Sequence, residues 1–520
     1  MVKWEDKDQG MKVLLIRPPV TLFANEMKLL GFPLGLAYVA ASLETSGIQV
    51  EVLDALAATG TGSCFGPGRH AEAAEGDRPR DKVDRPRDEM IHCGMDWPDI
   101  EQHIRHAQPE VVGINCMFTS QARNAYEVAA LAKRVDPKIT VVMGGAHASS
   151  VPEEVLARPE VDWVVLGEGE STLPKALASR GDPAELREIA GFGCKIDHQV
   201  IINHQREYIP DLDQIPLPAW HLFPMDRYLN TEMSHGPDLM RRPLASMITS
   251  RGCPCRCVYC SVHTVWGRSY RPRSPKNVVD EIELLVRQYG VREIHFEDDN
   301  LTLQRDRLIA ICKEIITRGL DIKWMTPNGV FLLSLDREVL GWMKKAGCYK
   351  LCFGIESGDP ETQKFIHKRV PLDRCKRIVK EANRLGIWTH GFFILGFPFE
   401  TREAIHRTLA YAIESDLDFA SFFLAVPYPH TELSQIMKDH GMLDHAGPDL
   451  RAFGATVDTK YLTREELSAL QRTMYKRFAV RRVMGLLNPV KLSYRLRRLK
   501  SLEDWRLMIR YLKRFLQIVK

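Results

Sequence analysis

Four cysteines lie within the eight residues that end the string Gly252-Cys253-Pro254-Cys255-Arg256-Cys257-Val258-Tyr259-Cys260. Cys253, Cys257 and Cys260 have the spacing C-x3-C-x2-C. Three thiolates on one loop can each bind one iron of a [4Fe–4S] cube. The fourth iron then has no protein ligand, and an open metal position is what catalysis requires. The spacing therefore predicts a catalytic iron–sulfur cluster.

A structural zinc site that uses Cys255 as its fourth ligand, in a binding module rather than an enzyme, is the alternative. Zinc sites usually combine two C-x2-C knuckles that lie far apart in the sequence, and this chain has no second knuckle. The cluster is the favoured interpretation. Cys255 is then expected to be a loop thiol that binds no metal.

The elements that would position these cysteines form a repeating pattern. A strand predicted at 245–249 directly precedes the cysteine string, and a helix is predicted from Ser274-Pro275 to Gly290. Further strands are predicted at 293–296, 322–325, 350–353, 391–395 and 420–424. Six such repeats over 245–435 predict a partial (β/α)6 barrel of the TIM type, with its chemistry at the carboxyl ends of the strands.

A second α/β region precedes the first, over residues 11–180. Its five apolar strands are predicted at 12–16, 50–53, 111–114, 139–143 and 163–166. Apolar strands that alternate with helices indicate a doubly wound parallel sheet, buried on both faces. Such sheets bind ligands outside the carboxyl ends of their strands. The loops expected there contain Pro18, Thr119, Ser120, Gly144, Gly145, His147, Gly167, Glu168 and Gly169.

The composition of these loops favours a large flat ligand over a dinucleotide. Paired glycines let the backbone approach a large flat ligand, and small hydroxyl groups can bond its tail. Gly-x-Gly-x-x-Gly is missing, which disfavours a dinucleotide.

The remaining segments have other compositions. Residues 59–92 are rich in Gly, Pro, Arg and acids and are expected to be a mobile surface insertion. Residues 181–244 have weak periodicity and a proline cluster, which predicts a connector. Residues 436–520 are expected to be helical and basic.

Length and composition bound the class of protein. The chain has 520 residues, 45% hydrophobic and 27% charged, which is typical of a soluble globular protein of two or three domains. No apolar run reaches the ~18 residues needed to span a bilayer. The N-terminus lacks a secretory signal, and the cysteine usage suits a reducing compartment, so a cytoplasmic location is expected. Collagen-like, coiled-coil, integral-membrane and wholly disordered classes are excluded.

Over residues 11–179 and 211–435, these strings together resemble the cobalamin-binding radical S-adenosylmethionine (SAM) enzymes. The strings Pro33-Leu34-Gly35-Leu36-Ala37-Tyr38 and Tyr428-Pro429-His430-Thr431-Glu432 belong to the same resemblance. It implies that Cys253, Cys257 and Cys260 hold the cluster, whose free iron binds SAM and cleaves it to a 5′-deoxyadenosyl radical. The residues implied to lie around SAM are Tyr259, Asp298, Asp299, Glu356 and Gly396. For the last four, ordinary strand-end turn chemistry is the alternative.

The resemblance also implies that the N-terminal region binds cobalamin, through the nine loop residues named above. Asp-x-His-x-x-Gly is absent from this region, so no protein histidine is expected below the cobalt. His147 is expected to hydrogen-bond a neighbour or a corrin amide. Related methylthiotransferases replace the corrin by an auxiliary cluster, but Cys64, Cys93 and Cys116 are too scattered to favour that reading.

The implied activity is methyl transfer from methylcobalamin to an unactivated carbon of a small molecule, such as a lipid or a secondary-metabolite intermediate. An external electron donor such as flavodoxin or ferredoxin is implied too. The alternative is an enzyme that uses both cofactors without transferring methyl, for example in an oxidative cyclisation or a rearrangement.

The C-terminal tail concentrates positive charge. Residues 471–520 have 15 Lys or Arg against Glu503 and Asp504, a net of +13, whereas the whole chain has +4. The rest of the chain is therefore acidic (4 − 13 = −9), and no global nucleic-acid footprint is indicated. An apolar stripe at helical spacing comprises Trp505, Met508, Ile509, Leu512, Leu516 and Val519. It predicts either peripheral contact with an anionic membrane or, as the favoured reading, a terminal helix that packs on the barrel.

Overall fold

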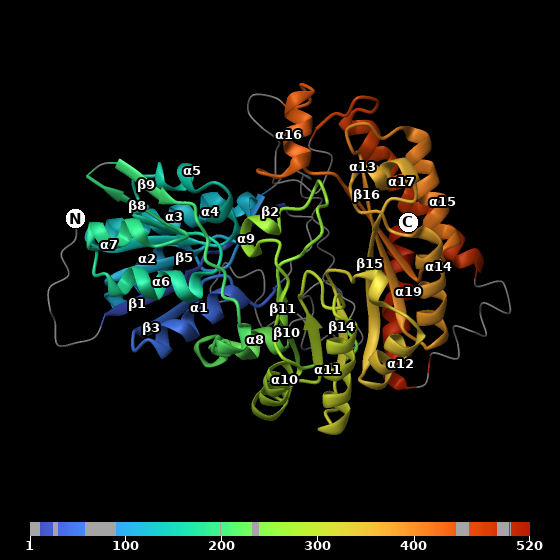
Figure 1. The fold of residues 1–520 in the computed structure, drawn as a ribbon, viewed down its shortest axis with the longest axis horizontal. Coiled ribbons are helices and arrows are strands. Elements are labelled where there is room, and N and C mark those ends of the chain that lie inside the picture. Colours follow the sequence, from blue (N-terminus) through green and yellow to red (C-terminus); the bar gives the residue numbers. More distant parts are fainter. Residues whose placement is uncertain are drawn as a thin grey trace, which may run out of the picture. The chain divides into compact units, whose positions relative to one another are not determined.

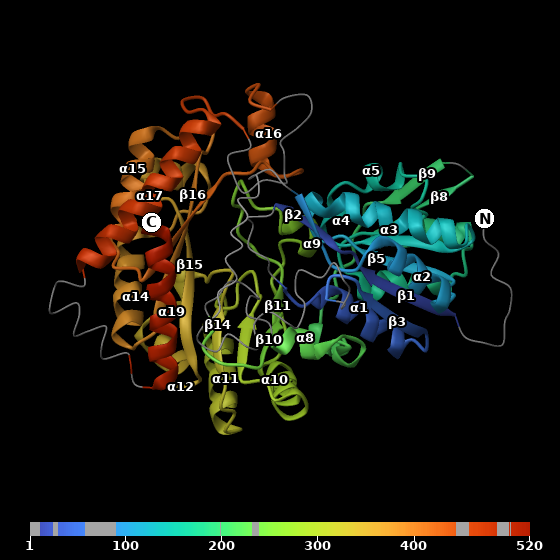
Figure 2. The ribbon, with the colours of Figure 1, turned by 180° about the vertical axis from the view of Figure 1, so that it is seen from behind.

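The computed structural model describes residues 11–23, 30–57, 90–197, 199–230, 239–443, 457–485, 499 and 501–519. The chain forms two compact units (Figures 1 and 2). Unit 1 comprises Met1–Pro210 with Gln214–Gly236, and unit 2 comprises Asp211–Asp213 with Pro237–Lys520.

Unit 1 is built on a seven-stranded sheet with the order β3-β1-β5-β6-β7-β8-β9. Its parallel strands are β3 (Gln49–Asp54), β1 (Lys12–Arg17), β5 (Val111–Asn115), β6 (Thr140–Gly144) and β7 (Trp163–Val165). These are the five predicted strands, and the doubly wound parallel sheet is confirmed. Val13–Ile16 are at most 1% exposed, because helices cover both faces of the sheet.

The covering helices of unit 1 lie in two layers. Figures 1 and 2 show α1 (Leu34–Thr45) and α6 (Gly169–Ala178) on one face, and α2 (Trp97–Ala107) and α3 (Ala122–Val135) on the other. Because the five strands are parallel, their carboxyl ends meet at one edge of the sheet, and the predicted ligand loops lie there.

Two expectations for unit 1 are corrected by its strands. Residues 192–203, expected within the connector 181–244, form two strands that extend the sheet. β8 (Phe192–Ile196) pairs antiparallel with β7, and β9 (Gln199–Asn203) pairs antiparallel with β8. Most of the expected insertion 59–92 lies outside the described residues. Its last three residues, however, belong to β4 (Met90–Cys93), which pairs antiparallel with β2 (Val20–Phe23). The β7–β8 and β2–β4 pairings join segments distant in sequence, which local periodicity does not reveal.

Unit 2 contains six parallel strands in chain order: β10 (Leu244–Met247), β13 (Glu293–Phe296), β14 (Lys323–Thr326), β15 (Cys348–Glu356), β16 (Trp388–Leu395) and β17 (Phe419–Leu424). β10 and β17 do not pair with each other, so the barrel is open, and the predicted partial (β/α)6 barrel is confirmed. Its helices are α10 (Pro275–Tyr289), α11 (Arg305–Thr317), α12 (Arg337–Lys345), α14 (Leu372–Arg384) and α15 (Arg402–Glu414).

The helix α10 has the predicted ends. The Ser274 hydroxyl accepts a hydrogen bond from the Asn277 amide at 3.2 Å, and Pro275 occupies the first turn. Gly290 ends the helix with φ of 66°, in the left-handed region that glycine adopts without strain.

Where the structure describes it, the C-terminal part of unit 2 is mainly helical, as predicted, with α16 (Glu432–Asp439), α17 (Arg464–Met484) and α19 (Leu502–Val519). α19 packs near the amino ends of the strands, where Leu507 is buried with Met325, Tyr349 and Trp388. The terminal helix therefore packs on the barrel as predicted, but through Leu507, whereas Trp505 and Ile509 of the predicted apolar stripe are 44% and 47% exposed. Across the described ranges, no helix is both long and apolar enough to cross a membrane.

Candidate active site

The cysteine string leaves the barrel through a constrained turn. β11 (Ser250–Arg251) pairs antiparallel with β12 (Arg271–Pro272), so the two ends of the loop are held together. Gly252 begins the loop with φ of 80°, and a Cβ there would collide with the carbonyl oxygen of Ser269. Only glycine fits this position, which fixes the direction in which the cysteines leave the strand.

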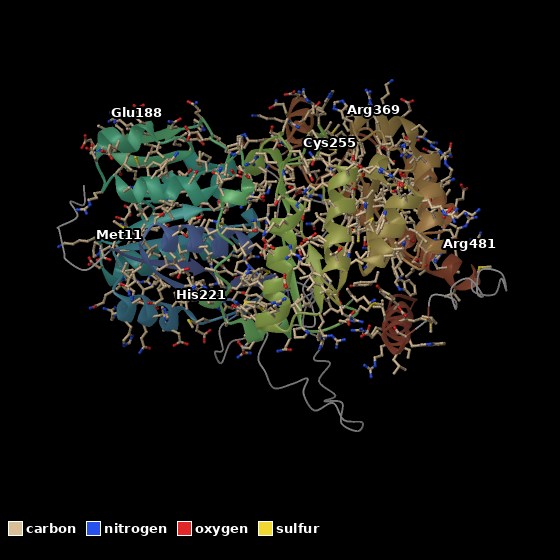
Figure 3. The ribbon with its side chains drawn as sticks, turned by 60° about the horizontal axis from the view of Figure 1, so that its bottom comes forward. Met11, Glu188, His221, Cys255, Arg369 and Arg481 are labelled. Atoms are coloured by element: carbon tan, nitrogen blue, oxygen red, sulfur yellow. The ribbon has the colours of Figure 1, made fainter. Side chains whose placement is uncertain are left out.

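The four cysteines of the loop differ from the other described free cysteines in their exposure. Cys253, Cys255, Cys257 and Cys260 are partly exposed. Figure 3 labels Cys255 of this loop. The other described free cysteines are buried: Cys116, Cys194, Cys312, Cys348, Cys352 and Cys375. Partly exposed thiols can bind metal, whereas buried ones act as small apolar side chains.

The protonation of the loop cysteines is uneven. A hydrogen bond from the Cys255 thiol lowers the pKa of Cys253, and the Asn300 amide and the Lys368 charge act in the same direction. Burial raises the pKa of Cys260 to about 11. Because metal ligands are thiolates, iron binding must release protons from this loop.

A single zinc ion and a cluster make different demands on the donors. Zinc requires four donors at ~2.0–2.3 Å from one ion. Among the described residues, no three His, Cys, Asp or Glu side chains converge in that way. A [4Fe–4S] cube makes a different demand, since each thiolate binds a separate iron. Three thiols spread along one exposed loop fit that demand.

The string Glu297-Asp298-Asp299-Asn300 directly follows β13, and its side chains have different partners. Asp298 is 2% exposed, and its carboxylate accepts hydrogen bonds from the Thr249 amide at 3.0 Å, the Thr249 hydroxyl at 2.7 Å and the Ser250 hydroxyl. Arg307 anchors the same turn by donating to the Thr249 carbonyl at 2.7 Å. In this structure Asp298 therefore holds the start of the cluster loop.

The neighbours of Asp298 face the cysteines and β10. The Asn300 amide lies 4.0 Å from the Cys253 sulfur, at the limit of a hydrogen bond to sulfur. Burial, followed by the charges of Cys253 and Asp298, raises the pKa of Asp299 to about 7. Glu297 accepts a hydrogen bond from the Ser246 hydroxyl at 2.8 Å. Asp299 and Asn300 are thus the members of this string beside the cluster loop.

An ion pair lies beside the cysteines at the end of β15. Glu356 has φ of 66°, which is strained for a residue with a side chain. Its carboxylate lies 3.3 Å from the Lys368 ammonium and also bonds the Tyr259 hydroxyl. A Cβ on Gly354 would lie 2.8 Å from that carboxylate oxygen, so glycine leaves the room for the pair. The Lys368 charge acts on Cys253, Cys255 and Cys257.

The last predicted SAM-side residue, Gly396, follows β16. Its φ is 82°, and its amide donates to the Glu400 carboxylate at 2.7 Å. Glu400 is 2% exposed, and burial raises its pKa to about 8. Tyr259 packs 6.0 Å from Phe397, measured between ring centroids. Gly396, Phe397 and Tyr259 therefore belong to one apolar wall of the same site.

Hydrogen bonds link three of the predicted cobalamin loops at the carboxyl edge of unit 1. Gly145 follows β6 with φ of 102°, and a Cβ there would lie 2.6 Å from the Cys116 carbonyl oxygen. The Gly167 amide donates to the Ser149 hydroxyl at 2.9 Å. The loops after β5, β6 and β7 thus contact one another. The backbones of Gly144, Gly145 and Gly167 are partly exposed, as a flat ligand requires.

His147 uses both ring nitrogens within unit 1. Nε2 lies 2.9 Å from the Tyr126 hydroxyl, and Nδ1 lies 3.2 Å from the Thr119 hydroxyl. The side chain is 4% exposed, and burial lowers its pKa to about 4. This arrangement fits a neutral histidine that positions Thr119, and it does not offer a free nitrogen to a cobalt ion.

The other predicted loop residues have distinct placements. The Glu168 carboxylate is buried and accepts a hydrogen bond from the Ile209 amide at 2.7 Å. Gly169 begins α6, Pro18 is buried after β1, and Ser120 is partly exposed in a short 3-10 helix. Glu168 and Pro18 therefore support the loops, whereas Ser120 lies at the surface.

Two residues beside the predicted sites, Met117 and Lys368, were missed by sequence reasoning. Met117 and Phe118, which lie in the predicted loop beside Thr119, are 48% and 66% exposed, so this loop presents apolar side chains to solvent. Their place between a strand end and two hydroxyl residues was the available signal. Lys368 carries no such signal, because its neighbour Glu356 is 12 residues away in the sequence.

Two family models match the chain. The radical SAM superfamily matches residues 247–412, and the B12 binding domain matches residues 83–177. The first match contains the cysteine loop and the predicted SAM-side residues. The second contains the predicted cobalamin loops except Pro18.

Three relatives cover most of the chain. An uncharacterised methyltransferase of Pyrococcus horikoshii is 33% identical over 91% of this chain and 93% of its own length. The cytidylyl-2-hydroxyethylphosphonate methyltransferase of Streptomyces wedmorensis is 32% identical over 85% and 86%. An anaerobic magnesium-protoporphyrin IX monomethyl ester cyclase of Cereibacter sphaeroides is 29% identical over 74% and 62%.

The fold is also that of a solved structure. The cobalamin-dependent SAM radical enzyme OxsB, with aqua-cobalamin and SAM bound, matches with a TM-score of 0.69 and 14% identity. The match covers 98% of this chain and 72% of that one. At this identity the likeness concerns the fold.

Proposed function

This chain belongs to the cobalamin-binding radical SAM enzymes, and we propose that it is a methyltransferase that delivers a methyl group to an unactivated carbon of a small molecule. When bound, the cluster and SAM supply a 5′-deoxyadenosyl radical and cobalamin supplies the methyl group. The protein positions these groups and excludes water.

In unit 2, the roles we assign rest on the contacts of the cluster loop. Cys253, Cys257 and Cys260 would hold the cluster, and the Asn300 amide beside Cys253 would stabilise its thiolate. Asp298 would hold the start of the loop through Thr249 and Ser250.

Around SAM, we assign one role to the charged side chains and another to the apolar wall. Asp299 would face the amino group, because its carboxyl group lies within electrostatic reach of Cys253. Glu356 and Lys368 would face the polar end of the nucleoside or the methionine carboxylate. Tyr259 and the turn at Gly396 would form the apolar wall against the adenine.

In unit 1, the proposed cobalamin surface uses backbone and neutral groups. Gly144, Gly145 and Gly167 would let the corrin approach, with the Thr119 and Ser120 hydroxyls near its amides. His147 would orient Thr119 through their 3.2 Å hydrogen bond. The exposed side chains of Met117 and Phe118 would cover part of the flat ring.

The observation that carries the proposal is the cysteine loop: three partly exposed thiols with the C-x3-C-x2-C spacing follow the first barrel strand of a chain that also has a B12-type unit. An external one-electron donor such as flavodoxin or ferredoxin would reduce the cluster. A reducing cytoplasm would suit the cluster and the buried free thiols, whereas Cys93 is disulfide-bonded.

The test uses the anaerobically reconstituted enzyme with cobalamin, a reductant, and SAM whose methyl group is deuterated. Incubation with the small-molecule fraction of the source cells should yield 5′-deoxyadenosine and a product that carries the label on carbon. Absence of 5′-deoxyadenosine in every fraction would contradict the proposal.

The relatives include a cyclase, which favours one second candidate: a reaction that uses both cofactors and transfers no methyl. The same experiment separates the two. Formation of 5′-deoxyadenosine with an altered but unlabelled product would support the cyclase-type reaction.

A further inference from the structure

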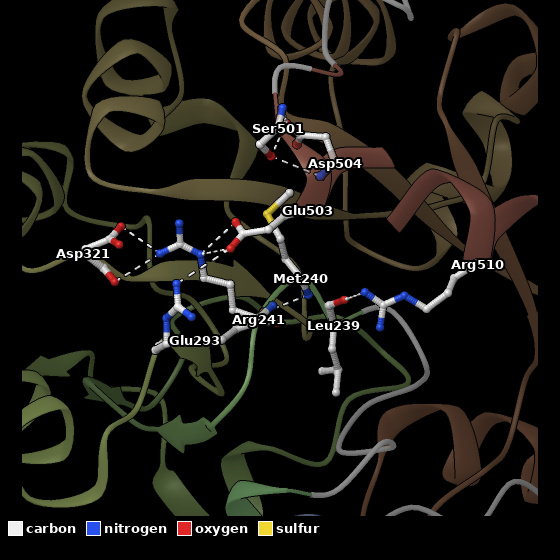
Figure 4. Close-up of polar contacts among 10 residues, drawn as sticks. Leu239, Met240, Arg241, Glu293, Asp321, Ser501, Glu503, Asp504 and Arg510 are labelled. Carbon is white, nitrogen blue, oxygen red and sulfur yellow. Dashed lines mark hydrogen bonds and ion pairs between the residues drawn. The ribbon is translucent and has the colours of Figure 1, made fainter. Parts of the chain in front are cut away.

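The helix α19 has two faces with different surroundings. Its inward face contains Glu503, Leu507 and Tyr511. Figure 4 shows the hydrogen bonds that the Glu503 carboxylate accepts from Arg241. Their lengths are 2.8 and 2.9 Å. Leu507 is fully buried, and Tyr511 lies 4.1 Å from Phe419 between ring centroids. This face attaches the helix to unit 2.

The outward face of α19 is apolar. With 3.6 residues per turn, Leu502, Trp505 and Ile509 lie on the side opposite Glu503, Leu507 and Tyr511. They are 77%, 44% and 47% exposed. Packing on the barrel therefore leaves Trp505 and Ile509 of the predicted apolar stripe exposed. Burial of these side chains requires another surface.

The helix α17 presents a similar surface. It is in contact with α19, and Figure 2 shows the two helices on the same side of unit 2. Its inward side chains pack on β17, where Tyr475 lies 5.3 Å from Phe422 between ring centroids. At its other side, Val480, Val483 and Met484 are 46%, 38% and 52% exposed.

The charges around these apolar side chains are positive. Arg477 and Arg481 on α17 and Arg506 on α19 are exposed, and none of them has an ion pair with another described residue (Figure 3 labels Arg481). The acids of α19 are engaged: Glu503 with Arg241, and Asp504 with the backbone and hydroxyl of Ser501. The surface is thus both apolar and cationic.

We propose that this surface, formed by Val480, Val483, Met484, Leu502, Trp505 and Ile509 with Arg477, Arg481 and Arg506, docks on an anionic membrane. Charge complementarity selects the occupant, because exposed aliphatic side chains within a cationic rim match lipid tails below anionic headgroups. Nucleic acid would use the arginines but would gain nothing from Val480, Met484 or Ile509. The contact is peripheral and reversible, and it does not rest on the proposed reaction.

The test measures co-sedimentation of the full, anaerobically reconstituted chain with lipid vesicles. Vesicles of phosphatidylcholine alone are compared with vesicles that also contain phosphatidylglycerol. We expect binding to the anionic vesicles to be at least about tenfold tighter, and to weaken strongly between ~0.1 M and ~1 M salt.

Two double variants separate the apolar and the charged contributions. Trp505→Ser with Ile509→Ser should weaken binding to anionic vesicles about tenfold, and Arg477→Glu with Arg481→Glu should do the same, mainly at low salt. The matched controls change equally exposed residues elsewhere: Val200→Ser in unit 1, which is 46% exposed, and Arg337→Glu on α12. All four variants should keep the wild-type circular dichroism spectrum.

Three outcomes would overturn the proposal. They are equal binding to neutral and anionic vesicles, wild-type binding by both double variants, and binding of duplex RNA through Arg477 and Arg481 without any binding of vesicles. The proposal stands independently of catalysis, because vesicle binding is measured without turnover.

Discussion

The two candidate sites of this chain are built from different chemistry. At the carboxyl edge of unit 1, the polar side chains satisfy one another: His147 bonds Tyr126 and Thr119, and Glu168 bonds a backbone amide. In unit 2, charged groups face the partly exposed cysteines, with Lys368 and Asp299 within electrostatic reach. The first arrangement suits a large ligand held by shape, and the second suits a ligand held by metal bonds and tuned by charge.

Of the variants that test this comparison, we expect the largest loss of stability from a change at Asp298. Asp298→Ala removes the acceptor of three buried donors and should lower the free energy of unfolding by about 3 kcal/mol, with loss of iron content. Urea unfolding and iron analysis under anaerobic conditions measure both quantities.

The matched control is Asn124→Ala in unit 1, a buried neutral anchor whose amide donates to the Pro19 carbonyl at 2.8 Å. This substitution should lower the free energy of unfolding by about 1 kcal/mol and leave the iron content unchanged. Equal costs for the two variants would remove the contrast between charged and neutral anchors.

A pH-dependent effect is expected in unit 1. Burial lowers the pKa of His147 from 6.5 to about 4, so the unfolded chain binds a proton at this residue before the folded chain does. The contribution of neutral His147 to the free energy of unfolding is therefore fully present above pH ~6.5. It falls as the pH drops towards ~4, with a loss of about 2 kcal/mol at pH ~5.

His147→Gln removes this titration and should flatten the corresponding part of the profile. Urea unfolding of both chains between pH ~5 and ~7 measures the difference. A wild-type profile that is as flat as that of the variant would show that burial does not keep His147 neutral.

The smallest effect is expected from the charge beside the cluster. Lys368→Met removes a cation that acts on three loop cysteines and should disfavour the reduced, more negative cluster by about tenfold, or about 59 mV for one electron. Lys368→Arg keeps the charge and should keep the potential. Redox titration followed by electron paramagnetic resonance measures the midpoint. Equal midpoints in wild type and Lys368→Met would exclude tuning by this residue.

The strands and the three cysteines proposed to hold the cluster were accessible to sequence reasoning because both have local signals. Apolar runs such as Val13–Ile16 are buried on both faces, and cysteine spacing reflects a single loop. β8 escaped prediction because Gly193 and Lys195 interrupt its apolar residues, and because its pairing with β7 is antiparallel at an edge.

The sequence could not predict that the side chains of Glu297, Asp298, Asp299 and Asn300 have different partners. Where a strand ends, the direction of each side chain depends on the neighbouring turns, here on Thr249 and Ser250 for Asp298 and on Cys253 for Asn300. The positive φ of Glu356 has the same origin, because only the folded chain brings Lys368 to it.

The central claim is that three thiols hold a cluster that cleaves SAM in an enzyme whose cobalamin is bound by another unit. The direct measurement compares wild type, the triple variant Cys253→Ala/Cys257→Ala/Cys260→Ala and the control Cys255→Ala, all prepared without oxygen and given a reductant. We predict that all three retain cobalamin, and that only the triple variant loses the absorbance near ~400 nm and the formation of 5′-deoxyadenosine. Formation of 5′-deoxyadenosine by the triple variant at the wild-type rate would contradict the account.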